Sequence, residues 1–72
     1  MAEAFFKIAY IGKSTLYAWD EFRNDIVPWN DNRASTYNSP YVAKAVLDII
    51  RGWYPGLADY FEVRGAHSAE RI

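Results

Sequence analysis

Residues 39–55 read SPYVAKAVLDIIRGWYP, and this stretch decides the fold because it contains the start, the periodicity and the end of an α-helix. Ser39 is a typical N-cap residue, since its hydroxyl can accept a hydrogen bond from an otherwise unpaired amide of the first turn. Pro40 suits the first helical position, where its missing N–H costs nothing. We expect Gly52 to end the helix and Pro55 to prevent its continuation.

The expected helix is amphipathic and has a wide apolar face. Its polar stripe consists of Tyr41, Lys44, Asp48 and Arg51. The rest of its surface is filled by Val42, Ala43, Val46, Leu47, Ile49 and Ile50. A helix with so much apolar surface requires a sheet or a partner to cover it.

An N-terminal β-hairpin is the expected cover for this helix. Residues 4–11, AFFKIAYI, have the alternation of a strand with two different faces. Gly12 and Lys13 fit a two-residue hairpin turn in which the glycine supplies a positive φ angle. Residues 14–19, STLYAW, then predict the second strand.

Residues 20–38 are the hardest part of the sequence to interpret. They are rich in Asn and Asp, yet a structureless segment of this length is uncommon in so small a domain. We therefore expect part of the segment to be ordered. Ile26 and Val27 are expected to extend the sheet until Pro28 ends it, and residues 32–37 are expected to form a helical turn.

The last strand completes the predicted architecture. Residues 59–64, DYFEVR, follow a Pro-Gly turn and alternate again. Residues 65–72 have little to bury and are expected to be a flexible tail. The sequence thus predicts one domain over residues 1–72 with an ordered core of about 4–64. Its class is α+β (ββαβ): a three- to four-stranded antiparallel sheet with one helix packed on one face.

Composition and charge restrict the class of function. The 72 residues include 8 basic and 9 acidic residues, for a net charge of −1, and no cysteine. This balance excludes a polybasic nucleic-acid binder and a strongly acidic DNA mimic. No apolar stretch approaches the ~20 residues that span a bilayer, and the first residues lack the pattern of a secretory signal. We expect a cytoplasmic protein that does not contact a membrane.

The sequence offers little for catalysis. There is no thiol nucleophile, and the single histidine, His67, falls in the expected tail. Ser39 is better explained as a helix cap than as a nucleophile. The acidic residues between positions 20 and 31 lack the glycine and the closing glutamate of a calcium-binding loop. We expect no enzymatic activity, no metal and no cofactor.

Aromatic residues are the strongest functional signal, with 3 Trp, 6 Tyr and 4 Phe. One helix can cover only one face of a sheet, so several rings should be exposed, and Tyr and Trp are enriched in binding hot spots. We therefore expect a non-enzymatic protein-binding module. Its surface would be the sheet face opposite the helix together with residues 20–38. The expected contact residues are Tyr17, Trp19 and Trp29 as anchors, then Tyr10 and Tyr60, with Asp20, Glu21, Arg23 and Asp25 as the polar rim.

Two other functions fit the same composition. Rings on a sheet can stack on the bases of a single-stranded nucleic acid, although the dispersed cations of this chain do not predict a basic groove. A structural homo-oligomer, such as a homodimer, would also cover exposed rings, and its melting temperature would depend on protein concentration.

Residues 29–39, WNDNRASTYNS, followed by Ala43, carry a resemblance to a known group of proteins. A Trp, an Ala, an aromatic residue, a capping Ser and a helical Ala behind an N-terminal hairpin resemble the pattern of small ββαβ proteins encoded by phages and prophages. The resemblance covers about residues 4–64. It implies that Ala34 and Tyr37 pack under the helix and that Ser39 caps it, and it brings no catalytic residues.

Many proteins of that kind bind a host protein, and some inhibit bacterial defence complexes such as CRISPR effectors. The resemblance therefore implies an inhibitor that occludes a host protein complex in the host cytoplasm. Because the chain is nearly neutral, occlusion through shape and aromatic contacts fits better than mimicry of DNA.

Overall fold

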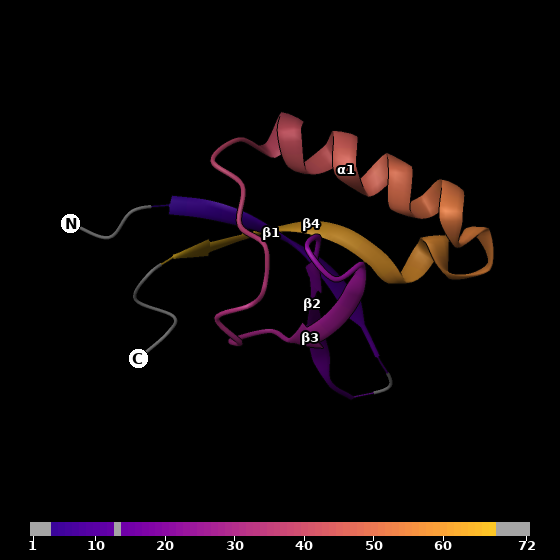
Figure 1. The fold of residues 1–72 in the computed structure, drawn as a ribbon, viewed down its shortest axis with the longest axis horizontal. Coiled ribbons are helices and arrows are strands. Elements are labelled where there is room, and N and C mark those ends of the chain that lie inside the picture. Colours follow the sequence, from indigo (N-terminus) through magenta and orange to yellow (C-terminus); the bar gives the residue numbers. More distant parts are fainter. Residues whose placement is uncertain (1–3, 13, 68–72) are drawn as a thin grey trace.

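The computed structural model describes residues 4–12 and 14–67 and shows an α+β fold (Figure 1). Four antiparallel strands form one sheet in the order β3-β2-β1-β4. A helix, α1, packs on the sheet, and a short 3₁₀ helix, η1, connects it to the last strand. The elements are β1 (Ala4–Ile11), β2 (Leu16–Asp20), β3 (Asp25–Pro28), α1 (Pro40–Trp53), η1 (Pro55–Tyr60) and β4 (Phe61–His67). This arrangement confirms the predicted fold class.

The helix begins as its sequence predicts. The Ser39 side chain accepts a hydrogen bond from the Tyr41 amide at 3.1 Å, and Pro40 occupies the first turn. The helix ends one residue later than expected, at Trp53, where the Tyr54 amide donates to the Ile50 carbonyl at 2.9 Å. Gly52 lies inside the last turn and has no positive φ angle.

The connection between β1 and β2 is longer than predicted. Ile11 pairs with Leu16, so four residues rather than two separate the strands. The Gly12 amide donates to the Thr15 carbonyl at 2.9 Å, and its φ angle is not positive. Glycine is favoured at this position for a steric reason, because the Cβ atom of any other residue would lie only 3.1 Å from the Thr15 carbonyl oxygen. Lys13 lies outside the described residues.

The last strand begins and ends later than predicted. Residues 55–60 form η1, so β4 begins at Phe61 rather than at residue 59. It then continues to His67 because the N-terminal half of β1 is available to pair with it, as in the pair Phe5–Ala66. Ala66 is buried, so residues 65–67 belong to the sheet instead of the expected tail. Residues 68–72 lie outside the described part of the chain.

The segment between β3 and α1 follows the edge of β1 that β2 leaves unpaired. β2 pairs only with Ala9–Ile11 of β1. Nearer the N-terminus, Phe6 and Tyr37 exchange two backbone hydrogen bonds of 2.8 Å each. Residues 32–37 therefore do not form the expected helical turn. Two reverse turns precede the bridge. The Asp31 amide donates to the Pro28 carbonyl at 3.0 Å, and the Ala34 amide donates to the Asp31 carbonyl at 3.1 Å.

Both faces of the sheet are covered, which corrects the predicted binding surface. Under α1 lies a core of Ile8, Trp19, Tyr37, Ala43, Leu47, Ile50 and Phe61. On the other face, Ala18, Val27 and Ala34 form a second cluster, with Trp29 packed against it. Ala34 thus packs away from α1, contrary to expectation, while Tyr37 packs under it as expected. The sheet face opposite the helix is not the open aromatic surface predicted from the sequence.

Candidate interaction surface

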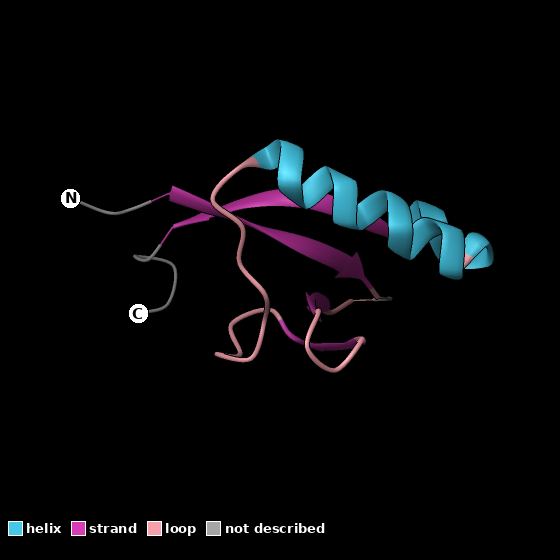
Figure 2. Cartoon of the chain, turned by 45° about the horizontal axis from the view of Figure 1, so that its top comes forward, coloured by secondary structure: helices cyan, strands magenta, loops and turns pink. Residues whose placement is uncertain are grey.

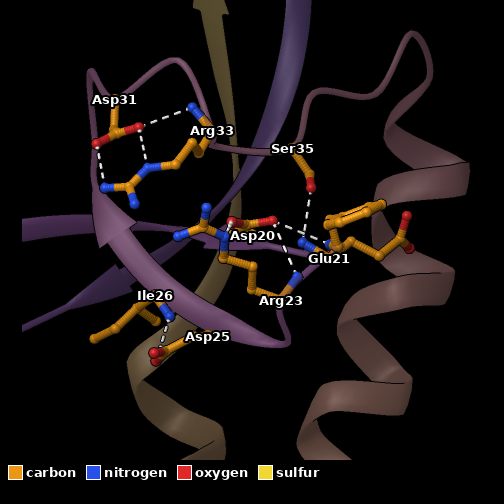
Figure 3. Close-up of polar contacts among 9 residues, drawn as sticks. Asp20, Glu21, Arg23, Asp25, Ile26, Asp31, Arg33 and Ser35 are labelled. Carbon is orange, nitrogen blue, oxygen red and sulfur yellow. Dashed lines mark hydrogen bonds and ion pairs between the residues drawn. The ribbon is translucent and has the colours of Figure 1, made fainter.

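The predicted polar rim is brought together by the turn between β2 and β3, but its first member has a structural role (Figure 3). Asp20 is only 2% exposed. Its Oδ1 accepts hydrogen bonds from the amides of Phe22 at 3.0 Å and of Arg23 at 3.3 Å. The buried carboxylate therefore fixes the backbone of the turn. The other three members of the predicted rim, Glu21, Arg23 and Asp25, are exposed.

Two further contacts hold this turn in place. The Glu21 amide donates to the Ser35 hydroxyl at 2.8 Å, and the Ser35 amide donates to the Trp19 carbonyl at 2.9 Å. Asn24 adopts the left-handed conformation, with φ 53°, which asparagine tolerates better than most residues. The turn is thus tied to residues 31–36 and has a defined backbone path.

Trp19 is part of the core, not an exposed anchor. It is 3% exposed, and its ring centroid lies 6.2 Å from Phe61 and 6.4 Å from Trp53. Trp19 lies on the α1 face of the sheet because alternate residues of a strand share a face. The end of α1 then brings Trp53 against it.

The other two predicted anchors do not lie on a common surface. Tyr17 is half-buried on the α1 face, with its ring 6.2 Å from that of Tyr10. Trp29 is half-buried on the opposite face. Its carbonyl accepts a hydrogen bond from Lys7 Nζ at 2.6 Å, and the same ammonium lies 4.8 Å from the centre of the indole. A single interface cannot include all three predicted anchors.

Exposed apolar residues instead follow one flank of α1. Val42, Ile49 and Trp53 are 54%, 53% and 54% exposed. Their spacing of seven and four residues places them on the same side of the helix. We call these three residues the α1 flank. The sequence indicated a wide apolar helix face, but not which part of it the sheet would leave uncovered.

A pocket of about 200 Å³ lies beside the end of α1. It exists because α1 packs over β4 and β1, so that β2 and β3 lie farther from the helix (Figure 2). The aromatic pocket, as we call it, is lined by the apolar side chains of Tyr10, Trp19, Ile26, Tyr54, Leu57 and Phe61. Asn24 from the turn and Asp25 from the start of β3 complete its lining.

Phe22 is the most exposed large apolar residue in the described part of the chain, at 96%. It lies in the same turn as Asn24, which Asp25 follows at the start of β3, but it does not line the pocket. Sequence reasoning missed Phe22, although a signal was present. Asp20 and Asn24 are typical turn residues, which makes an aromatic residue between them a candidate for an exposed side chain.

Among the described residues, the pKa of Asp31 is lowered and those of its partner Arg33 and of Tyr37 are raised. Hydrogen bonds from the Arg33 side chain and backbone lower the pKa of Asp31 from 3.8 to about 2. The bonds are 3.0 and 2.9 Å from the guanidinium and 2.8 Å from the amide. Burial, assisted by the Glu21 charge, raises the pKa of Tyr37 to about 12. The nearby Ser35 side chain has a smaller effect that lowers this pKa. The buried Tyr37 hydroxyl nevertheless has no hydrogen-bond partner in acceptable geometry among the described residues.

Comparisons with protein-family models, with curated proteins and with solved structures find no match for this chain. Within residues 4–12 and 14–67, no group of acidic or histidine residues could hold a metal ion. No helix in the same part of the chain is long and apolar enough to cross a membrane.

Proposed function

We propose that this chain is a non-enzymatic protein-binding module that contacts its partner through the α1 flank. One observation carries the proposal: Val42, Ile49 and Trp53 are each about half exposed on a single side of one helix. Apolar surface gathered in this way is typical of helices that pack against another protein. Tryptophan in particular is enriched among residues that dominate binding energy.

Charge supports a protein partner over a nucleic acid. The chain has 8 basic and 9 acidic residues. Arg33 and Arg64 form ion pairs with neighbouring acidic residues. Arg51 donates to two backbone carbonyls, at 3.1 and 2.8 Å. Recognition of a nucleic acid relies on cations aligned along a groove, and the cations paired in this way do not form one.

The resemblance of residues 29–39 to small phage-encoded ββαβ proteins extends the proposal. In this view the chain is an inhibitor that occludes a host protein complex, such as a CRISPR effector, in the host cytoplasm. A small domain with an apolar flank on a regular helix suits occlusion, because a surface that is ordered before binding loses little conformational freedom on binding.

The decisive experiment is capture of a stoichiometric partner from host lysate, followed by affinity measurements with the purified pair. Trp53→Ala should weaken binding by about 2 kcal/mol, or roughly 30-fold, if Trp53 is a hot spot. Ile49→Glu should weaken it similarly, because a charge would be buried without a counterion. Tyr41→Ala is the matched control, since Tyr41 is 83% exposed but lies outside the α1 flank.

Melting curves of each variant separate loss of binding from loss of folding. The proposal fails if no partner is captured in stoichiometric amount. It also fails if folded Trp53→Ala and Ile49→Glu proteins bind the captured partner as tightly as Tyr41→Ala does.

A further inference from the structure

We propose that two copies of this chain form a two-fold symmetric dimer in which Phe22 of each copy inserts into the aromatic pocket of the other. Phe22 is 96% exposed, and the neighbouring pocket of its own chain does not receive it. In a symmetric dimer, each exposed phenylalanine would be buried and each apolar pocket would be filled by the other copy. This inference uses residues outside the α1 flank and goes beyond the proposed function.

The pocket has the size and the lining that a phenyl ring requires. Its volume is about 200 Å³, and apolar cavities of roughly 150 Å³ are large enough to bind benzene. Tyr10, Trp19 and Phe61 contribute aromatic rings to its wall. Rings in such a wall can contact an inserted ring edge to face, which is the favoured arrangement of aromatic pairs.

The position of Phe22 relative to the pocket suits two-fold symmetry. Asn24 and Asp25 line the pocket, and Phe22 precedes Asn24 by two residues, a chain distance of at most about 7 Å. A residue and a pocket that lie side by side can be exchanged by a two-fold axis passing between them. Each copy then gives and receives one ring, and the assembly closes at two copies.

Charge complementarity also favours a second copy as the occupant. Arg23 lies next to Phe22, with 59% of its side chain exposed, and its Nε is 3.9 Å from Asp20. Asp25 is exposed where it lines the pocket. When Phe22 enters the partner's pocket, Arg23 approaches the partner's Asp25, and symmetry forms this pair twice. Opposite charges at the rim of an interface fix its register.

Sedimentation equilibrium over micromolar to millimolar concentrations tests the dimer. We expect wild-type protein to shift from monomer to dimer with a micromolar rather than nanomolar Kd, because the contact is small. Phe22→Ala should raise the Kd at least ~30-fold, as expected for a hot spot. Tyr41→Ala, also highly exposed but outside the contact, should leave the Kd unchanged.

A mixing experiment tests reciprocal insertion. Leu57 lines the pocket, so Leu57→Trp should fill it and abolish self-association while leaving Phe22 in place. An equimolar mixture of Phe22→Ala and Leu57→Trp retains one inserting ring and one open pocket. It should form mixed dimers more weakly than the wild type, but at concentrations at which neither variant alone associates. Circular dichroism and melting temperatures verify that both variants are folded.

The dimer is refuted if wild-type protein stays monomeric at millimolar concentration. It is also refuted if Phe22→Ala associates like the wild type, or if the mixture of Phe22→Ala and Leu57→Trp stays monomeric. A monomeric wild type whose pocket residues respond in NMR only to an added phenylalanine-containing peptide would assign the pocket to a foreign chain instead. The proposed function is tested independently, because Phe22→Ala leaves the α1 flank intact.

Discussion

Replacing Trp19 with alanine distinguishes a core residue from an interface residue. Trp19 is 3% exposed and contacts the rings of Trp53 and Phe61. Removal of a buried tryptophan loses its transfer free energy and leaves a cavity, which together lower the free energy of unfolding by about 3–5 kcal/mol. At roughly 0.05–0.15 kcal/mol per residue, 72 residues give a total stability of about 4–11 kcal/mol. Trp19→Ala should therefore be close to the limit of folding.

The measurement is urea unfolding followed by far-UV circular dichroism at 25 °C, in which a lower midpoint with an unchanged slope reports lost stability. If the variant is unfolded in buffer, both proteins are compared at one concentration of a stabilising osmolyte. Trp29→Ala is the matched control, because Trp29 is half-buried and Lys7 Nζ bonds to its backbone carbonyl, which the variant keeps. The free energy of unfolding of this control variant should fall by about 1–2 kcal/mol.

The reasoning about Trp19 is refuted if Trp19→Ala lies within about 1 kcal/mol of the wild type, a typical cost for an arbitrary substitution. It is equally refuted if the losses in Trp19→Ala and Trp29→Ala are the same. Either result would mean that the indole of Trp19 does not form the core under α1.

Two further predictions concern pH. The pKa of Asp31 is lowered to about 2 from 3.8, so its contribution to stability is fully present above pH 3.8 and is lost as the pH falls toward 2. Arg33→Gln should return this pKa toward 3.8 in an NMR titration, and an unchanged value would contradict the role of Arg33. The pKa of Tyr37 is raised from 10.0 to about 12, so its contribution is present below pH 10 and is lost as the pH rises toward 12. Tyr37→Phe removes a buried hydroxyl without a hydrogen-bond partner, so its free energy of unfolding should equal that of the wild type or exceed it by up to about 1 kcal/mol. In urea unfolding at different pH values, the variant should also lack the loss of stability between pH 10 and 12. A clear loss of stability in Tyr37→Phe would show that the hydroxyl is satisfied.

Features set by local chemistry were predictable from the sequence. Ser39 and Pro40 mark the helix start because capping involves only neighbouring residues. Ile26 and Val27 were correctly assigned to a strand that ends at Pro28. The alternation of residues 4–11 gave the correct strand for the same reason, since the side-chain period of a strand is local.

Features set by distant contacts were not predictable. The end of β4 depends on how far β1 extends beyond β2, which is seen in strand pairs such as that of Phe5 with Ala66. The burial of Trp19 and the exposure of Trp53 both depend on the lateral position of α1 over β1 and β4. An amphipathic pattern shows that a helix is covered on one side, but not where the cover ends.

The segment that sequence reasoning found hardest to interpret is the one whose hydrogen bonds order the backbone beneath the exposed side chains. Asp20 accepts two amides of the turn, and Ser35 ties the turn to the segment before α1. These contacts fix the backbone from which Phe22 and Asp25 project. A backbone that is already ordered loses less entropy on association. A small surface on this chain can therefore bind more tightly than the same residues on a mobile loop, and weakening the Asp20 and Ser35 contacts should reduce affinity without altering any residue at the contact.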